Sequence, residues 1–124
     1  MSSRYFVSAA DVPSYHPANH TGTVNRRLID PKRTGGNIEV LHGTLEPGEG
    51  ALPHSHPGIE QVCYLLEGVA VAEVDGERRE LGPGDSCYFP AGMRHVFTAV
   101  GRTPCKVLVI YAPPYEEDPL RVSR

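Results

Sequence analysis

Two histidines separated by one residue are the strongest chemical signal in the chain. His54 and His56 flank a single serine. On an extended strand both imidazoles therefore point to the same face, about 6–7 Å apart along the strand. This spacing suits two ligands of one metal ion. The pair alone is a weak signal, because such pairs also occur on protein surfaces.

The residues around this pair follow a longer pattern in two segments. The first reads Gly48-x5-His54-x-His56-x4-Gln61-x6-Gly68, and the second reads Gly84-x5-Pro90-x-Gly92-x2-His95-x3-Ala99. Both resemble the paired signature motifs of the cupin superfamily, and the resemblance covers residues 38–113. It implies a double-stranded β-helix, or jelly-roll barrel, with a metal ion at its mouth. It also implies that His54, His56 and His95 are metal ligands.

The fourth ligand departs from the family pattern. Gln61 occupies the glutamate position when counted back from Gly68, whereas Glu60 satisfies the shorter spacing after His56. Neighbouring strand residues face opposite sides, so only one of the two faces the barrel interior. The register from Gly68 selects Gln61, while a bulge near residues 57–58 would select Glu60 instead. In a further alternative, Gln61 only donates a hydrogen bond beside a three-histidine site.

An amide in place of a carboxylate changes the charge of the site. Three neutral imidazoles and one amide leave the full charge on a divalent ion, which then attracts chelating or anionic oxygen ligands more strongly. One divalent transition metal ion is expected, and Fe, Mn, Ni, Zn and Cu all suit such ligands. The other three histidines match no motif, and we interpret His16 and His20 as exposed loop residues and His42 as a packing residue.

Strand periodicity predicts which side chains line the pocket beside the metal. If Gln61 faces inward, Cys63 and Leu65 do so too, and Phe97 follows His95 in the same way. The last strand has two apolar faces, one with Leu108 and Ile110 and the other with residues 107, 109 and 111. We assign the first of these faces to the pocket. The result is a mostly apolar cavity without an arginine clamp, which suits a small molecule rather than a phosphate ester.

About eight short strands separated by turns must position these residues. Strand-like segments are expected at residues 38–45, 62–66, 69–74, 79–81, 86–89, 95–100 and 106–111. Asp75-Gly76 is a strong hairpin signal between two of them. Thirteen glycines and twelve prolines, spread along 124 residues, fit an all-β barrel with tight turns. We expect an N-terminal arm (1–36), a cupin barrel (37–113) and an acidic, extended C-terminal tail (114–124).

Composition limits the partners and the compartment. A net charge of −3 without a long basic run argues against nucleic acid. No apolar run approaches 18 residues and no signal peptide is visible, so we expect a cytoplasmic protein without a membrane partner. Three cysteines without CxxC spacing predict small buried residues rather than disulfides. The apolar patch at residues 24–29 of the arm predicts a homodimer in which the arm adds a strand to a partner's sheet.

Two classes of function fit these features. The first is a metal-dependent enzyme acting on a small oxygen-containing organic molecule, by isomerase or lyase chemistry or as an Fe(II) dioxygenase. The exchange of glutamate for glutamine favours the non-redox chemistry, because it is similar to that in cupins that process sugar acids or cleave cyanohydrins. The alternative is a non-catalytic module that binds a small ligand. The sequence assigns no catalytic residue.

Overall fold

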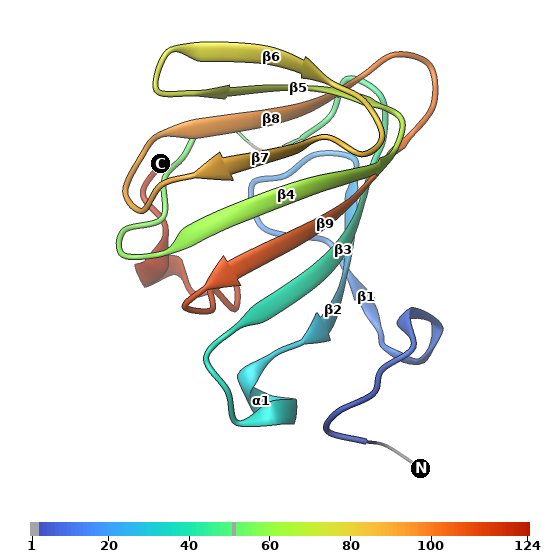
Figure 1. The fold of residues 1–124 in the computed structure, drawn as a ribbon, viewed down its shortest axis with the longest axis vertical. Coiled ribbons are helices and arrows are strands. Elements are labelled where there is room, and N and C mark those ends of the chain that lie inside the picture. The colour runs from blue at the N-terminus through green and yellow to red at the C-terminus, as the bar shows by residue number, and fades with distance from the viewer. Residues whose placement is uncertain (1–2, 51) are drawn as a thin grey trace.

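The computed structural model describes residues 3–50 and 52–124 of the chain. Its strands form two antiparallel sheets, one of six strands in the order β1-β2-β3-β9-β4-β7 and one of three in the order β6-β5-β8 (Figure 1). The strand bounds are β1 Ser14–Tyr15, β2 Thr23–Ile29, β3 Glu39–Leu45, β4 Glu60–Glu67, β5 Val69–Val74, β6 Glu77–Leu81, β7 Ser86–Phe89, β8 His95–Val100 and β9 Cys105–Ala112. The prediction of an all-β jelly-roll barrel is confirmed.

The hairpin between β5 and β6 forms where the sequence predicts it. Asp75 and Gly76 have φ values of 49° and 78°, and the flanking Val74 and Glu77 pair across the turn. A two-residue loop with both φ values positive has a twist that matches the twist of the strands it joins. The turn therefore fixes the register between β5 and β6. The other neighbour of β5 in the smaller sheet is β8.

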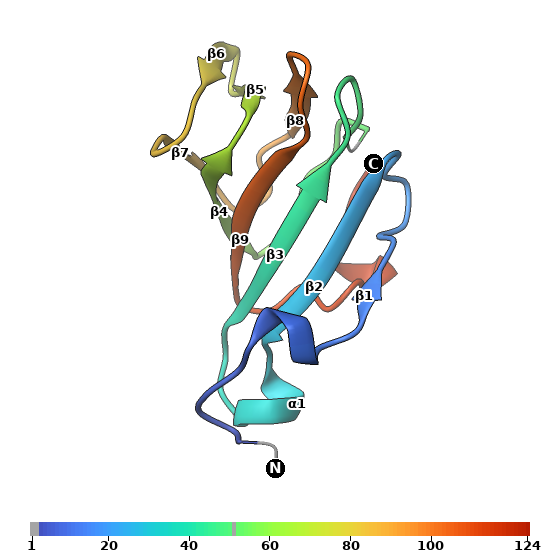
Figure 2. The ribbon, with the colours of Figure 1, turned by 90° about the vertical axis from the view of Figure 1, so that its right-hand side faces the viewer.

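The barrel core lies between the sheets and is built by alternating side chains. Every second residue of β3 and β9 is buried. The register of the larger sheet places Val109 beside both Leu41 and Cys63, so these three side chains share the inner face. Figure 2 shows β2, β3 and β9 running side by side along the molecule.

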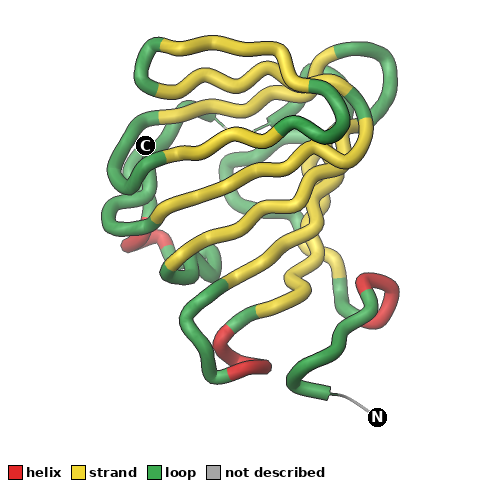
Figure 3. Tube along the Cα trace, viewed as in Figure 1, coloured by secondary structure: helices red, strands yellow, loops and turns green. Residues whose placement is uncertain are grey.

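The helical segments are short and lie outside the barrel (Figure 3). They are η1 (Ala9–Asp11), α1 (Pro31–Thr34) and η2 (Pro119–Arg121). The α1 turn begins at Asp30, whose side chain accepts a hydrogen bond from the Arg33 N–H, and it ends at Gly35 in the left-handed region. Among the described residues, no helix has the length and apolar character needed to cross a bilayer.

The apolar patch of the N-terminal arm forms β2, which pairs with β3 of the same chain from Thr23 to Ile29. The strand that we expected to extend a partner's sheet thus extends the chain's own larger sheet. This pairing buries Thr23 and Asn25 on the inner face. The homodimer and the division of the chain into an arm, a barrel and a tail stay predictions.

The C-terminal tail folds back onto the barrel instead of extending away from it. Ser123 pairs with Ser55 through two backbone hydrogen bonds of 2.8 Å. Tyr115 is buried against the core. The expectation of an extended arm is therefore wrong. The sequence does not reveal this folding back, because main-chain groups hold the tail at Ser123 and the side-chain pattern contains no sign of them.

Candidate metal centre

Three histidines from two separate segments meet inside the barrel. His54 and His56 lie in the loop before β4, and His95 begins β8. Two backbone hydrogen bonds join His54 and His95, with N–O distances of 3.1 and 2.8 Å. All three side chains are buried, and one ring nitrogen of each lies within 4.8 Å of those of the other two. The structure therefore brings together the three histidines that the motif predicts.

Main-chain carbonyl groups orient all three rings. The Nδ1 atom of His54 lies 2.7 Å from the carbonyl oxygen of Leu52. The corresponding distances are 2.9 Å from His56 to Arg121 and 3.1 Å from His95 to Met93. A carbonyl oxygen only accepts hydrogen bonds, so each Nδ1 carries the proton and donates. Each Nε2 then keeps its lone pair, which is the tautomer that metal ligation requires.

The atoms left without partners show that the site fits a metal ion. The Nε2 atoms of His56 and His95 and the Oε1 atom of Gln61 are buried, and none has a hydrogen-bond partner in the described part of the chain. Buried polar atoms without partners are costly, and a metal ion would satisfy lone-pair donors of this kind. The cluster therefore fits a divalent ion, whose identity the donors do not select.

Gln61 rather than Glu60 faces the interior. Gln61 is 7% exposed, and its Nε2 donates to the Cys63 sulfur at 3.4 Å. This contact turns Oε1 away from the thiol and leaves it free as an acceptor. Glu60 is exposed on the other face of β4, where its carboxylate accepts a hydrogen bond from the Tyr88 hydroxyl. The roles of Gln61 and the three histidines as ligands stay predictions.

The pocket beside the cluster is lined by neutral side chains. Its described wall consists of His20, Thr23, Asn25, Leu41, Leu45, His54, Gln61, Cys63, Phe89, His95, Phe97, Val107, Val109 and Tyr111. The wall therefore includes the predicted Cys63 and Phe97. Leu65 is buried in the core without lining the pocket.

The assignment of Leu108 and Ile110 to the pocket is wrong. The opposite face of β9 lines it, because the register sets Tyr111 beside Gln61 and Val109 beside Cys63. Leu108 and Ile110 are half-buried on the outer face of the sheet. Residues 107–111 of this strand are apolar or aromatic on both faces. The one residue that marks the outward side is the exposed Lys106, which shares its face with Leu108 and Ile110.

Aromatic rings support two of the three histidines. Phe89 stacks on His95, with ring centroids 4.0 Å apart and planes at 5°. Tyr115 and Tyr111 contact His56, with centroids 4.4 and 5.3 Å away. The motif does not indicate these supports. They restrict ring rotation and exclude water from the apolar side of the cluster.

Burial keeps the cluster neutral. Desolvation lowers the pKa of His95 to about 3 and that of His56 to about 4, and it also lowers the pKa of His54. The hydrogen bond with Cys87, followed by burial, raises the pKa of the Cys63 thiol well above its ordinary value. Burial also raises the pKa of the Tyr111 hydroxyl well above its ordinary value. The pocket thus offers neutral imidazole, thiol and phenol groups near pH 7.

The metal-free protein should lose stability as the pH falls below about 6.5. Unfolded histidines take up protons near that pH, whereas folded His56 and His95 do so only near 4 and 3. The unfolded state therefore binds more protons across this window, and each histidine lowers the free energy of unfolding by about 1.4 kcal/mol at pH 5.5. Urea unfolding at pH 7.5 and 5.5 measures the difference. His56→Ala should reduce it, and His16→Ala on the exposed arm should not; equal unfolding midpoints at both pH values would contradict the assignment of buried, neutral rings.

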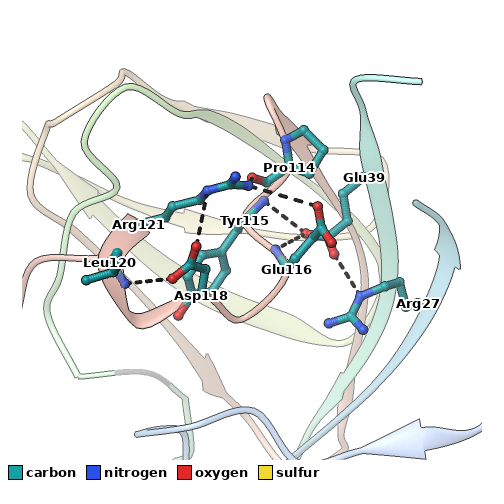
Figure 4. Close-up of polar contacts among 8 residues, drawn as sticks. All are labelled: Arg27, Glu39, Pro114, Tyr115, Glu116, Asp118, Leu120 and Arg121. Carbon is teal, nitrogen blue, oxygen red and sulfur yellow. Dashed lines mark hydrogen bonds and ion pairs between the residues drawn. The ribbon is translucent and has the colours of Figure 1, made fainter. Parts of the chain in front are cut away.

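A buried carboxylate fastens the tail beside His56. Glu39 is 1% exposed and accepts a hydrogen bond from Arg27 Nε at 2.7 Å. It also accepts from the backbone N–H groups of Tyr115 and Glu116, at 3.3 and 3.0 Å (Figure 4). Farther along the tail, the Arg121 carbonyl accepts from His56. Glu39 alternates with the buried Leu41 and faces the same side of β3, but its partners come from β2 and the tail rather than from the pocket.

Comparison with known proteins places the chain in a family. The family model for the cupin domain matches residues 41–111, which is more than half of the chain. The protein belongs to the cupin superfamily, as its two motifs indicate. The matched residues include all three histidines and Gln61.

Two curated relatives and two solved structures illustrate this likeness. The chain is 32% identical to the tetracenomycin polyketide synthase protein TcmJ of Streptomyces glaucescens, over 81% of this chain and 68% of the relative. It is also 32% identical to the uncharacterized protein MJ1618 of Methanocaldococcus jannaschii, over 78% of each chain. The polyketide cyclase RemF of Streptomyces resistomycificus superposes with a TM-score of 0.79 at 24% identity, covering 96% of this chain and 83% of that one. KdgF of Halomonas sp. superposes with a TM-score of 0.78 at 20% identity, covering 90% and 96%.

Proposed function

We propose that the protein is a metal-dependent enzyme acting on a small, largely apolar organic molecule that carries a carbonyl, enol or hydroxyl oxygen. The proposal rests on one observation, the convergence of unpartnered donor atoms in a buried pocket. His56 Nε2, His95 Nε2 and Gln61 Oε1 are the donors in question. When bound there, a divalent ion supplies a Lewis acid that stabilises negative charge on a substrate oxygen.

The chemistry of the wall narrows the substrate class. Among the described lining residues there is no Asp, Glu, Lys or Arg. A substrate charge would therefore have no ionic partner in the wall, and most of the remaining surface is aliphatic or aromatic. These features support a molecule with an apolar body and one or two oxygen groups rather than a sugar phosphate. The names of TcmJ and RemF, which concern polyketides, are compatible with such a molecule.

The ligand set supports non-redox chemistry over oxygen activation. Gln61 supplies an uncharged amide oxygen, so the donors do not offset the charge of a divalent ion. Such a site favours the stabilisation of an enolate, as isomerase, lyase or cyclase reactions require. Cys63 and Tyr111 are the protonated groups of the wall, and their raised pKa values suit hydrogen-bond donation rather than proton abstraction.

Metal loading followed by a probe assay tests this function. Protein stripped with a chelator and titrated separately with Mn(II), Fe(II), Co(II), Ni(II) and Zn(II) should bind one ion per chain. At 100 times the dissociation constant, binding should stabilise the fold by about 2.7 kcal/mol. The metal-loaded protein should then catalyse deuterium exchange into a 1,3-diketone such as acetylacetone. His42→Ala, on the outer face of β3, is the matched control that should bind and react as the wild type does.

The possible outcomes separate the alternatives. Absence of saturable metal binding would overturn the proposal as a whole. Consumption of oxygen by the Fe(II) form with the same diketone would replace non-redox chemistry with dioxygenase chemistry. Tight diketone binding without exchange, under every metal, would identify a binding module instead.

A further inference from the structure

His20 carries a buried polar atom that the proposed metal centre does not use. It lies in the segment before β2 and lines the same pocket as His54, His95 and Gln61. Its Nδ1 is buried and has no hydrogen-bond partner within residues 3–50 and 52–124. The sequence predicts an exposed loop histidine here, and this interpretation is wrong. No local motif marks the residue, because only the chain path brings it to the pocket.

Backbone contacts on both sides hold His20 in place. The carbonyl oxygen of Asn19 lies 3.5 Å from the Leu52 nitrogen, and the Thr21 N–H donates to the Gly50 carbonyl at 3.2 Å. The partner segment leads directly into His54, so the position of His20 is tied to the cluster. The ring centroids of His20 and His54 lie 6.1 Å apart, with planes inclined at 58°.

His20 nevertheless stands outside the cluster itself. The group of ring nitrogens lying within 4.8 Å of one another contains only His54, His56 and His95 among the described residues. Burial also keeps His20 uncharged and lowers its pKa to about 4. A neutral imidazole both donates and accepts hydrogen bonds, so it suits an oxygen or hydroxyl group of a molecule lying in the pocket.

We propose that His20 is a positioning residue that hydrogen-bonds an oxygen of the molecule held in the pocket. This inference rests on the proposed function and narrows its substrate class. The molecule carries a polar oxygen group that faces the N-terminal segment, in addition to the oxygen that faces the three histidines. Because the rings of His20 and His54 are 6.1 Å apart, the two oxygens are close together, and the apolar remainder of the molecule lies against Phe97, Val107 and Val109. A molecule that lacks the second oxygen would leave the buried His20 nitrogen without a hydrogen-bond partner, and it would therefore bind more weakly.

Separate titrations of metal and probe test the inference. The probe is acetohydroxamate, a small oxygen chelator, titrated into the Co(II)-loaded protein and followed by calorimetry and by the Co(II) absorption spectrum. His20→Ala should raise the dissociation constant of acetohydroxamate about 10-fold. It should change the dissociation constant of Co(II) less than twofold. His20→Gln, which keeps a donor and an acceptor, should recover most of the lost probe affinity.

His16→Ala is the matched control, because His16 lies on the same segment, is exposed, and bonds to the Thr23 carbonyl. It should leave both constants unchanged. If His20→Ala weakens Co(II) and acetohydroxamate equally, His20 is a metal ligand and the inference is wrong. If probe affinity is the same in wild type and His20→Ala, the inference is also wrong, while the proposed function stands. If wild type itself binds no Co(II), the proposed function fails first.

Discussion

Replacing His95 with alanine should lower the affinity for a divalent metal about 100-fold. A tetracoordinate zinc site provides about 10–16 kcal/mol, so one lost ligand corresponds to roughly 3 kcal/mol. The fall in affinity should be large, because His54 and His56 belong to one segment and cannot enclose an ion without the ligand from β8. Competitive titration against a chromophoric chelator measures the change.

Two further variants keep this prediction sharp. His95 also stacks on Phe89, so its removal leaves a cavity and some structural loss is expected. His54→Ala should cause a comparable fall in metal affinity without disturbing that stack. His42→Ala, away from the pocket, should bind as tightly as the wild type. Retention of wild-type affinity by both site variants would show that these histidines do not hold the ion.

Replacing Glu39 with alanine should lower the free energy of unfolding by about 3 kcal/mol. The change removes the acceptor for Arg27 and for two backbone N–H groups of the tail. Arg27 is 26% exposed and regains some hydration, which keeps the loss near the lower end for a broken buried pair. Urea unfolding at pH 7.5 provides the measurement.

Matched variants separate charge, volume and general destabilisation. Glu39→Gln keeps the shape and one acceptor oxygen, so it should lose about half as much stability. Glu73→Ala removes an exposed ion pair with Arg78, with side chains 48% and 69% exposed, and should change stability by less than about 0.5 kcal/mol. Equal effects of Glu39→Ala and Glu73→Ala would show that the tail does not depend on the buried carboxylate.

Deleting residues 118–124 tests how the tail acts on the metal centre. This shorter chain keeps both N–H donors to Glu39 but loses the Arg121 carbonyl that accepts from His56. Its metal affinity should fall about 10-fold, as is usual when a partner of a ligating histidine is lost. Fold stability at pH 7.5 should fall less than in Glu39→Ala.

The sequence predicts the grouping of the three histidines well because its motifs contain fixed points. Gly68 sets the register of β4, and counting back from it correctly turns Gln61 and Cys63 inward. Asp75-Gly76 fixes the hairpin in the same way. The last strand has a weaker marker. Residues 107–111 of β9 are apolar or aromatic on both faces, and the charged Lys106 at its start is the one residue that indicates that Leu108 and Ile110 face outward.

Features that depend on contacts distant in sequence were not predictable from local pattern. His20 reaches the pocket because its neighbours Thr21 and Asn19 make backbone hydrogen bonds with Gly50 and Leu52, about thirty positions later. The tail returns to His56 across 65 positions. At His20 the deciding groups are peptide N–H and C=O, and at the tail each contact has a peptide group as one partner, which every residue possesses. Periodicity and residue type therefore contain no signal for them.

The anchoring of the three imidazoles by peptide carbonyls has a consequence for mutational scanning. Leu52, Met93 and Arg121 each orient a ring, yet alanine at any of these positions would keep the same oxygen. A side-chain scan would therefore not detect the orienting role of Leu52 and Met93, and at Arg121 it would report only the loss of the side chain's own bond to the Pro114 carbonyl. Insertions and deletions of one residue would displace the oxygens, so length rather than composition is the constrained property of these loops.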